Sequence, residues 1–109
     1  LAVALGARPE TPAGMAGLGD LVLTCGSTQS RNMSLGQRLG RGERLDAILE
    51  GRQSVTEGVA TARAVLGRAE RAGVDMPICA ARHAVLHEGR PVGDAIEALL
   101  ARPLRAEHA

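Results

Sequence analysis

The sequence predicts an all-α protein, an orthogonal bundle of six or seven helices. No segment alternates polar and apolar residues with the two-residue period of a strand, whereas several segments repeat apolar residues with a helical period. Apolar residues make up 45% of the 109 residues, but there is no Phe, Tyr or Trp. A core of small and aliphatic side chains suits closely packed helices, because strands favour aromatic and β-branched residues.

The amino-terminal part is expected to form two helices. Residues 1–5 have the composition of a helix end, which Gly6 would terminate. Thr11-Pro12 is a suitable helix start for residues 13–24, since Thr can cap and Pro is tolerated in the first turn. Three glycines in this helix each lower its propensity by about 1 kcal/mol relative to Ala. They indicate close approach of another backbone or of a ligand.

Five further helices are expected over residues 30–40, 45–50, 55–72, 78–88 and 92–101. Ser30 is a suitable cap for the first of them, and Gly73 and Gly89 are suitable terminators for the third and fourth. The apolar residues expected to face inward are Leu35, Leu39, Leu45, Ile48, Leu49, Val55, Val59, Ala62, Leu66, Ala69, Ile96, Leu99 and Leu100. A chain of this length predicts one domain, residues 1–109, with a modest core.

The composition excludes several classes of protein. A formal net charge of +1 predicts no general attraction to nucleic acid or to membranes, and no apolar run has membrane-spanning length. No signal peptide is expected, so a reducing cytoplasm is expected. Cys25 and Cys79 match no metal-ligand spacing and are expected to be small core residues. The chain begins at Leu1 inside helical sequence, which suggests a fragment of a longer protein.

One carboxylate lies within an apolar run. Asp20 and Thr24 are four residues apart, so on a helix both project from one face. The neighbouring leucines and Val22 predict that Asp20 is partly buried, and a buried carboxylate needs a cation or several donors. All 13 basic residues are Arg, so a lysine partner would have to come from elsewhere. The alternative is that Asp20 pairs with an Arg and fixes the packing of helices.

The triplet Ser30-Arg31-Asn32 has the outline of an anion site. It stands at an expected helix start, where N–H groups are unpaired and the helix dipole is positive. An Arg in that turn is unfavourable for the isolated helix, but it can grip a phosphate or carboxylate bidentately. The alternative is a solvated Arg31 beside an ordinary Ser30 cap.

Two other groups carry weaker signals. Glu57 follows Ser54 at the spacing of a capping box, which is a sufficient explanation for it. His83 and His87 are four residues apart, but no Glu lies between them in the metalloprotease pattern. The sequence therefore predicts no metal site.

Five blocks of the sequence are characteristic together: residues 16–25 (AGLGDLVLTC), 29–32 (QSRN), 55–58 (VTEG), 76–79 (MPIC) and 88–103. With these blocks the chain resembles a known family, the C-terminal domain of bacterial-type NAD(P)-dependent glycerol-3-phosphate dehydrogenase. The resemblance covers essentially the whole chain, and the first two blocks are the specific ones.

The resemblance implies a helical domain of the 6-phosphogluconate dehydrogenase C-terminal type, preceded in the whole enzyme by a Rossmann domain that binds NAD or NADP. The enzyme would interconvert dihydroxyacetone phosphate and sn-glycerol 3-phosphate, a phospholipid precursor, and would form a homodimer. The resemblance assigns the substrate to Asp20, Ser30, Arg31 and Asn32, and cofactor contacts to Arg31, Val55 and Glu57. Asp20 would also orient a catalytic lysine, with Thr24 in support. Since this chain has no lysine and no dinucleotide-binding fold, it should be inactive alone.

Two departures and two alternatives complete the interpretation. Val59 and His87 stand where an aromatic residue is common in the family, and both are interpreted as drift in packing or surface residues.

One alternative is the helical domain of a related dehydrogenase acting on a non-phosphorylated acid. The other is an Arg-rich module that binds nucleic acid. It is disfavoured because 13 basic residues face 12 acidic ones and no aromatic residue can stack on bases.

Overall fold

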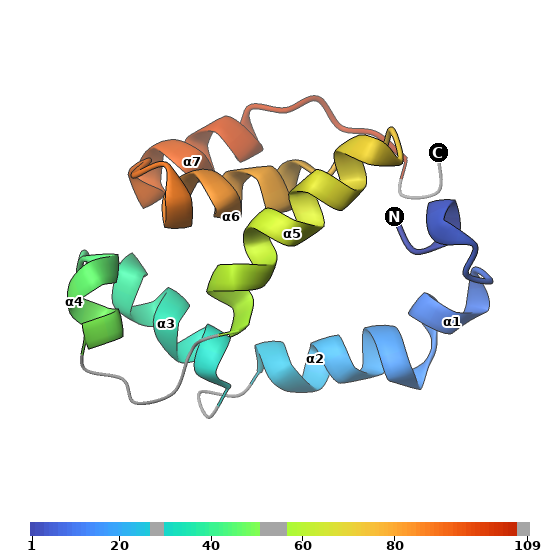
Figure 1. The fold of residues 1–109 in the computed structure, drawn as a ribbon, viewed down its shortest axis with the longest axis horizontal. Helices are drawn as coiled ribbons and strands as arrows, with labels where there is room; N and C mark the ends of the chain where they lie inside the picture. Colours follow the sequence, from blue (N-terminus) through green and yellow to red (C-terminus); the bar gives the residue numbers. More distant parts are fainter. Residues whose placement is uncertain (27–29, 51–56, 107–109) are drawn as a thin grey trace.

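The computed structural model describes residues 1–26, 30–50 and 57–106, which form helices and no strand (Figure 1). This confirms the all-α prediction. The α-helices are α1 (Glu10–Ala13), α2 (Asp20–Cys25), α3 (Arg31–Gly40), α4 (Leu45–Glu50), α5 (Glu57–Arg71), α6 (Pro77–His87) and α7 (Val92–Leu100). A 3₁₀ turn, η1 (Val3–Leu5), and a π-helical segment, η2 (Met15–Gly19), lie near the amino terminus.

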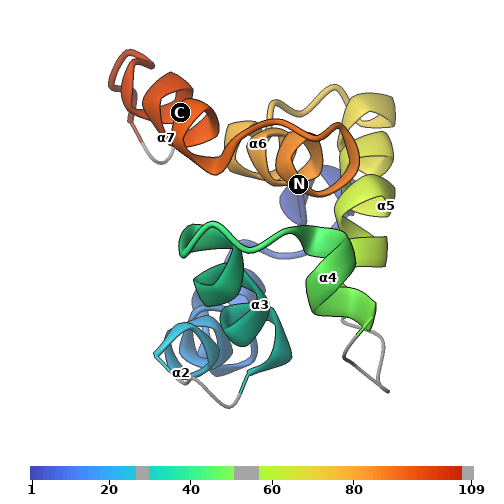
Figure 2. The same ribbon diagram turned by 90° about the vertical axis from the view of Figure 1, so that its left-hand side faces the viewer.

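The helices form two layers that α5 connects. Helix α6 packs between α5 and α7, and α3 packs on α4. Figures 1 and 2 show α6 and α7 on one side of the molecule and α3 and α4 on the other, with α5 running from one layer to the other. The amino end of α5 therefore lies beside α3. The rest of α5 runs away from α3 and packs along α6 (Figure 1).

The core lies where these layers meet. Leu35, Ile48, Ala62 and Leu86, from α3, α4, α5 and α6, form one buried cluster, and Ile48 is completely inaccessible to solvent. Leu39, Leu45 and Val59 pack around this cluster and are half-buried. The helical periodicity predicted these inward positions correctly except Leu86, which was not among the predicted residues, and the predicted Val55 lies outside the described residues.

The predicted helix over residues 13–24 is wrong as a single element. Helix α1 begins at Glu10, with Pro9 at its N-cap, and ends at Gly14, whose extended ψ of −165° breaks the helix. The chain then continues through η2 into α2. A Cβ atom on Gly17 would overlap the main chain of Pro12, so glycine is required where η2 meets the preceding turn. The predicted close approach of a backbone is thus confirmed at Gly17, and the backbone is the chain's own.

Other predictions at the surface have mixed outcomes. Ile96 and Leu100 are exposed, so their predicted inward placement is wrong; α7 turns Ala95 and Leu99 toward its neighbours instead. Cys25 is exposed and Cys79 is half-buried, both as free thiols, so the prediction of core cysteines is wrong for Cys25. The predicted terminators are confirmed, since Gly6, Gly73 and Gly89 have positive φ values of 99°, 66° and 69°.

Candidate functional site

Helix α3 begins at the predicted cap. Ser30 has extended backbone angles, and its Oγ accepts a hydrogen bond from the Met33 N–H at 3.4 Å. This confirms Ser30 as the N-cap. Arg31 and Asn32 form the first turn, which contains no acidic residue. The positive end of the helix dipole is therefore uncompensated by an acid within this turn, and the guanidinium of exposed Arg31 adds a full positive charge.

Asn32 connects α3 to α5. Its Oδ1 accepts a hydrogen bond from the Gly58 N–H at 3.1 Å, across 26 residues of sequence. Of the two polar atoms of the carboxamide, only the oxygen can accept this hydrogen bond, so the oxygen faces α5. The carboxamide nitrogen is then the atom that could donate to a ligand. A Cβ atom on Gly58 would overlap this carboxamide, so the contact depends on glycine.

Two side chains of α6 hold the same turn of α5. Arg82 donates from Nη2 to the Gly58 carbonyl oxygen at 3.1 Å, and His87 Nε2 lies 2.6 Å from the Val59 carbonyl oxygen. The sequence analysis missed Arg82, and it interpreted His87 and Val59 as drift in packing or surface residues without predicting their contact. No local pattern could have revealed these bonds, since 24 and 28 residues separate the partners.

Glu57 is the first residue of α5, directly before Gly58. The amino ends of α3 and α5 therefore meet, and Figure 1 shows them side by side. Val55, the other residue predicted to contact a cofactor, lies outside the described residues, as does Ser54 of the expected capping box.

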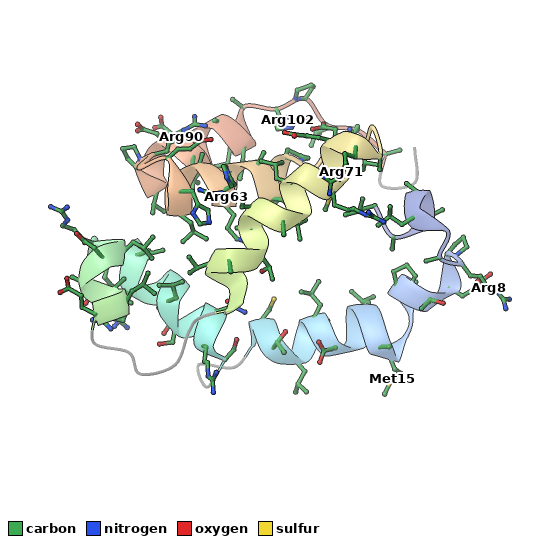
Figure 3. The ribbon with its side chains drawn as sticks, viewed as in Figure 1. Arg8, Met15, Arg63, Arg71, Arg90 and Arg102 are labelled. Atoms are coloured by element: carbon green, nitrogen blue, oxygen red, sulfur yellow. The ribbon has the colours of Figure 1, made fainter. Side chains whose placement is uncertain are left out.

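The partial burial predicted for Asp20 is wrong in this chain. Asp20 and Thr24 are exposed on α2, as are Leu18, Leu21 and Leu23 around them. The reason is that α2 packs chiefly on η2, so its apolar surroundings remain open to solvent. In Figure 3, Met15 points away from the other helices, and its exposed fraction is 89%. The sequence pattern showed correctly that the segment around Asp20 is apolar, but it did not show whether another element buries that segment.

Asp20 and Thr24 do lie one helical turn apart. The Thr24 hydroxyl donates to the Asp20 carbonyl oxygen at 3.0 Å, with the Leu21 carbonyl oxygen also near, at 3.3 Å. Thr24 therefore acts on the α2 main chain that carries Asp20, through its hydroxyl. Helix α2 ends at Cys25, and its C-cap Gly26 is four residues before Ser30, so Gly26 and Ser30 lie within about 14 Å of each other.

The hollows found among the described residues lie away from the predicted site or are small. One of about 740 Å³, lined by the α3–α4 and α6–α7 turns, includes none of the predicted site residues. A cavity of about 90 Å³ lies beneath Asn32, Gly58 and Arg82, well under the size of ordinary ligand pockets. A ligand held by Arg31 and Asn32, which are both exposed, would consequently lie on an open face of the described structure.

Neither a metal site nor a membrane span is found in the described parts. No group of three or more His, Cys, Asp and Glu side chains there is placed to hold a metal ion. His83 faces Glu88 at 3.3 Å, and its ring centroid lies 5.1 Å from that of His87. Within the same ranges, no helix has the length and apolarity to cross a bilayer.

The comparisons with known proteins agree with this architecture. Residues 1–97 match the family model described as NAD-dependent glycerol-3-phosphate dehydrogenase C-terminus. Glycerol-3-phosphate dehydrogenase [NAD(P)+] of Maricaulis maris is 62% identical over 109 residues, covering 100% of this chain and 33% of that protein. The Caulobacter vibrioides protein of the same name is 59% identical over 107 residues, covering 98% and 32%. The crystal structure of glycerol-3-phosphate dehydrogenase from Coxiella burnetii has a TM-score of 0.86 and 36% identity, covering 93% of this chain and 31% of that one.

The fold defines an all-α domain in which two helix amino ends meet beside an exposed arginine. The chain belongs to the family of NAD-dependent glycerol-3-phosphate dehydrogenase C-terminal domains. The predicted family is therefore confirmed. The chain spans about a third of the length of the curated relatives that it matches.

Proposed function

We propose that this chain is the helical, substrate-closing domain of an enzyme that reversibly reduces dihydroxyacetone phosphate to sn-glycerol 3-phosphate with NADH or NADPH. The observation that carries the proposal is the start of α3. A capped helix end, an exposed Arg31 and a carboxamide with a free donor side are placed together there. This donor set suits a phosphate, which takes hydrogen bonds from a guanidinium and from helix N–H groups.

The proposed roles follow the positions of the residues. Ser30, Arg31 and Asn32 hold the substrate, with Arg31 and Asn32 at its phosphate. Asp20, the first residue of α2, contacts the substrate and orients a lysine ammonium that acts as general acid and base. Thr24 supports Asp20 through the hydrogen bond to its main chain. Because this chain contains no lysine, that group comes from the remainder of the enzyme.

The nicotinamide cofactor, when bound, supplies the hydride. Two residues of this chain fit the cofactor. Glu57 begins α5, and Arg31 is the chain neighbour of Asn32, which contacts Gly58 next to Glu57. We assign Arg31, Val55 and Glu57 to contacts with NAD or NADP. A preceding Rossmann domain would hold most of the cofactor.

The wider assignment rests on the family. We propose that residues 1–109 form one domain of a two-domain cytoplasmic enzyme of phospholipid precursor synthesis, a homodimer without affinity for nucleic acid. The net charge of +1 supports the last point.

A chimeric enzyme tests the proposal. The chain is joined to the part of the Maricaulis maris enzyme that precedes its match, and kcat and KM are measured with dihydroxyacetone phosphate and NADH or NADPH. Arg31→Ala should lower kcat/KM, because transition-state binding is weakened by about 1.5–3 kcal/mol, the range for a hydrogen bond to a charged group. Arg68→Ala is the matched control, since Arg68 lies about 16 Å along α5 from its amino end.

Two further results bear on the same proposal. Asp20→Asn should lower kcat more than it raises KM, because it disturbs the acid–base group. The 109-residue chain alone should show no turnover. An unchanged kcat/KM in the Arg31 variant, or turnover by the isolated chain, would contradict the proposal.

A further inference from the structure

We infer that Arg82 and His87 of α6 are positioning residues for this reaction, which fix the first turn of α5 against Asn32 and so join the cofactor end of the site to the substrate end. The inference rests on the proposed function for Arg31, Asn32 and Glu57. We call Asn32, Arg82 and His87 the α5 clamp.

The α5 clamp acts on the main chain of two residues. Asn32 accepts from the Gly58 N–H, Arg82 donates to the Gly58 carbonyl, and His87 contacts the Val59 carbonyl. The Gly58 N–H is in the first turn of α5 and has no acceptor within its own helix, so Asn32 caps α5 from another helix. A carbonyl oxygen has two lone pairs and can accept both a helical bond and a side-chain bond. Three elements, α3, α5 and α6, are thus joined at one turn.

The placement of Arg82 is not explained by the stability of α5 alone. A cation beside the amino end of a helix opposes the helix dipole and is unfavourable for that helix. Arg82 nevertheless has its guanidinium on the second residue of α5. Its charge therefore adds to those of Arg31 and of the two helix ends, and it raises the potential where the proposed anions bind.

Packing beneath the clamp is loose. The cavity of about 90 Å³ is lined by Asn32, Gly58, Arg82 and apolar side chains of α3 and α6. Val59 and Ala62 pack on the core, but apolar contact does not fill the space beside Gly58, so the hydrogen bonds of the clamp contribute to the position of this turn. Gly58 is buried and His87 is half-buried, whereas Asn32 and Arg82 are exposed, so the three bonds are partly buried and only their α5 side is shielded from water.

The consequence concerns Glu57 and Asn32 together. A shift of Gly58 moves Glu57, its chain neighbour, and releases the Asn32 carboxamide from the orientation that leaves its nitrogen toward the substrate. Loss of either α6 donor should thus weaken binding of both the cofactor and dihydroxyacetone phosphate, and should leave kcat nearly unchanged.

The test uses the chimeric enzyme described above. Arg82→Met and His87→Leu should each raise both KM values about 3–10-fold, the effect of one lost hydrogen bond, with kcat changed less than about twofold. Arg82→Lys and His87→Gln retain a donor and should recover most of the affinity. Arg90→Met, at the exposed turn after α6, is the matched control and should leave both KM values unchanged.

Amide exchange gives a readout besides activity. In the ¹⁵N-labelled chimeric enzyme, Arg82→Met and His87→Leu should speed exchange of the Gly58 amide at least 10-fold, while the buried Ala95 amide of α7 exchanges as in the parent. Where a variant does not fold, the comparison is made between the lysine or glutamine variant and the parent, and a Gly58 rate equal to the parent's supports the clamp.

The outcomes separate the inference from the proposed function. If Arg31→Ala is impaired but the α6 variants behave as Arg90→Met, the inference is wrong and the function stands. If the α6 variants lose kcat without any change in KM, or if their Gly58 and Ala95 amides accelerate equally, the residues are merely structural and the inference is again wrong. If Arg31→Ala is unimpaired, the proposed function fails first.

Discussion

Replacing Gly58 by Ala tests the contact between α3 and α5 in the 109-residue chain itself. The added Cβ atom would overlap the Asn32 carboxamide. Either the carboxamide rotates away, which breaks its 3.1 Å hydrogen bond with the Gly58 N–H, or α5 moves away from α3. Both changes disturb a buried residue, so we expect a loss of stability where helix propensity alone predicts a gain.

The magnitude follows from two costs and one gain. Losing the hydrogen bond costs about 0.5–1.5 kcal/mol, and inserting a methyl group into occupied space costs about 1–3 kcal/mol. Alanine in a helix returns up to about 1 kcal/mol relative to glycine. The free energy of unfolding of Gly58→Ala should thus be lower than that of the parent by about 0.5–3.5 kcal/mol.

Urea unfolding followed by circular dichroism measures this difference. Gly36→Ala in α3 is the matched control, because its Cβ atom would meet nothing within 4 Å, and it should gain up to about 1 kcal/mol. Gly58→Ala in an Asn32→Ala background should no longer destabilise, since the obstructing carboxamide is gone. If Gly58→Ala is as stable as the parent, or if its effect persists without Asn32, the reasoning about the contact is refuted.

Two further predictions concern the core and the surface. Ile48→Ala should lower the free energy of unfolding by about 2–5 kcal/mol, because Ile48 is completely buried, whereas half-exposed Ile96→Ala should cost under about 1 kcal/mol; equal losses would contradict the assigned core. Hydrogen bonds from Arg38 lower the pKa of Glu43, so their stabilisation is present above the ordinary carboxyl pKa of 4.5 and is lost as the pH falls through the lower folded pKa. Relative to Glu43→Gln, the parent should therefore lose stability below about pH 4.5 in urea titrations from pH 7 to pH 3, and a constant difference over that range would contradict the pair.

Features set by short stretches of sequence were predictable. The Ser30 cap, the turns at Gly73 and Gly89 and the inward faces of α3 and α4 depend on neighbours within one or two helical turns. The local sequence is sufficient to predict them, since an N-cap needs a side-chain oxygen at one position and a core face needs apolar residues at a helical period. The family itself was recognisable from such local blocks.

Features set by distant partners were not predictable in the same way. Periodicity says that a segment has an apolar side, but it does not say which element covers that side, and Asp20 on α2 is exposed for this reason. Similarly, Ile96 continues the apolar pattern of α7 but is exposed, whereas its neighbour Ala95 is buried. A short helix rich in Leu, Val and Ile is apolar on more sides than it can bury.

Asn32 shows why the residue type at the centre of the proposed site is specific. Its oxygen accepts from Gly58, which an aspartate could also do, but an aspartate would place a negative charge beside the phosphate that the proposed function requires. A serine or threonine hydroxyl is shorter and has one proton to donate, and a glycine or alanine would leave the Gly58 N–H without its acceptor. Asparagine alone combines, at this length, an acceptor for α5 with a neutral donor for an anion. A shift of α5 therefore changes the orientation of the Asn32 carboxamide, and with it the donor that faces the substrate. This is the physical basis for coupling the two ends of the site.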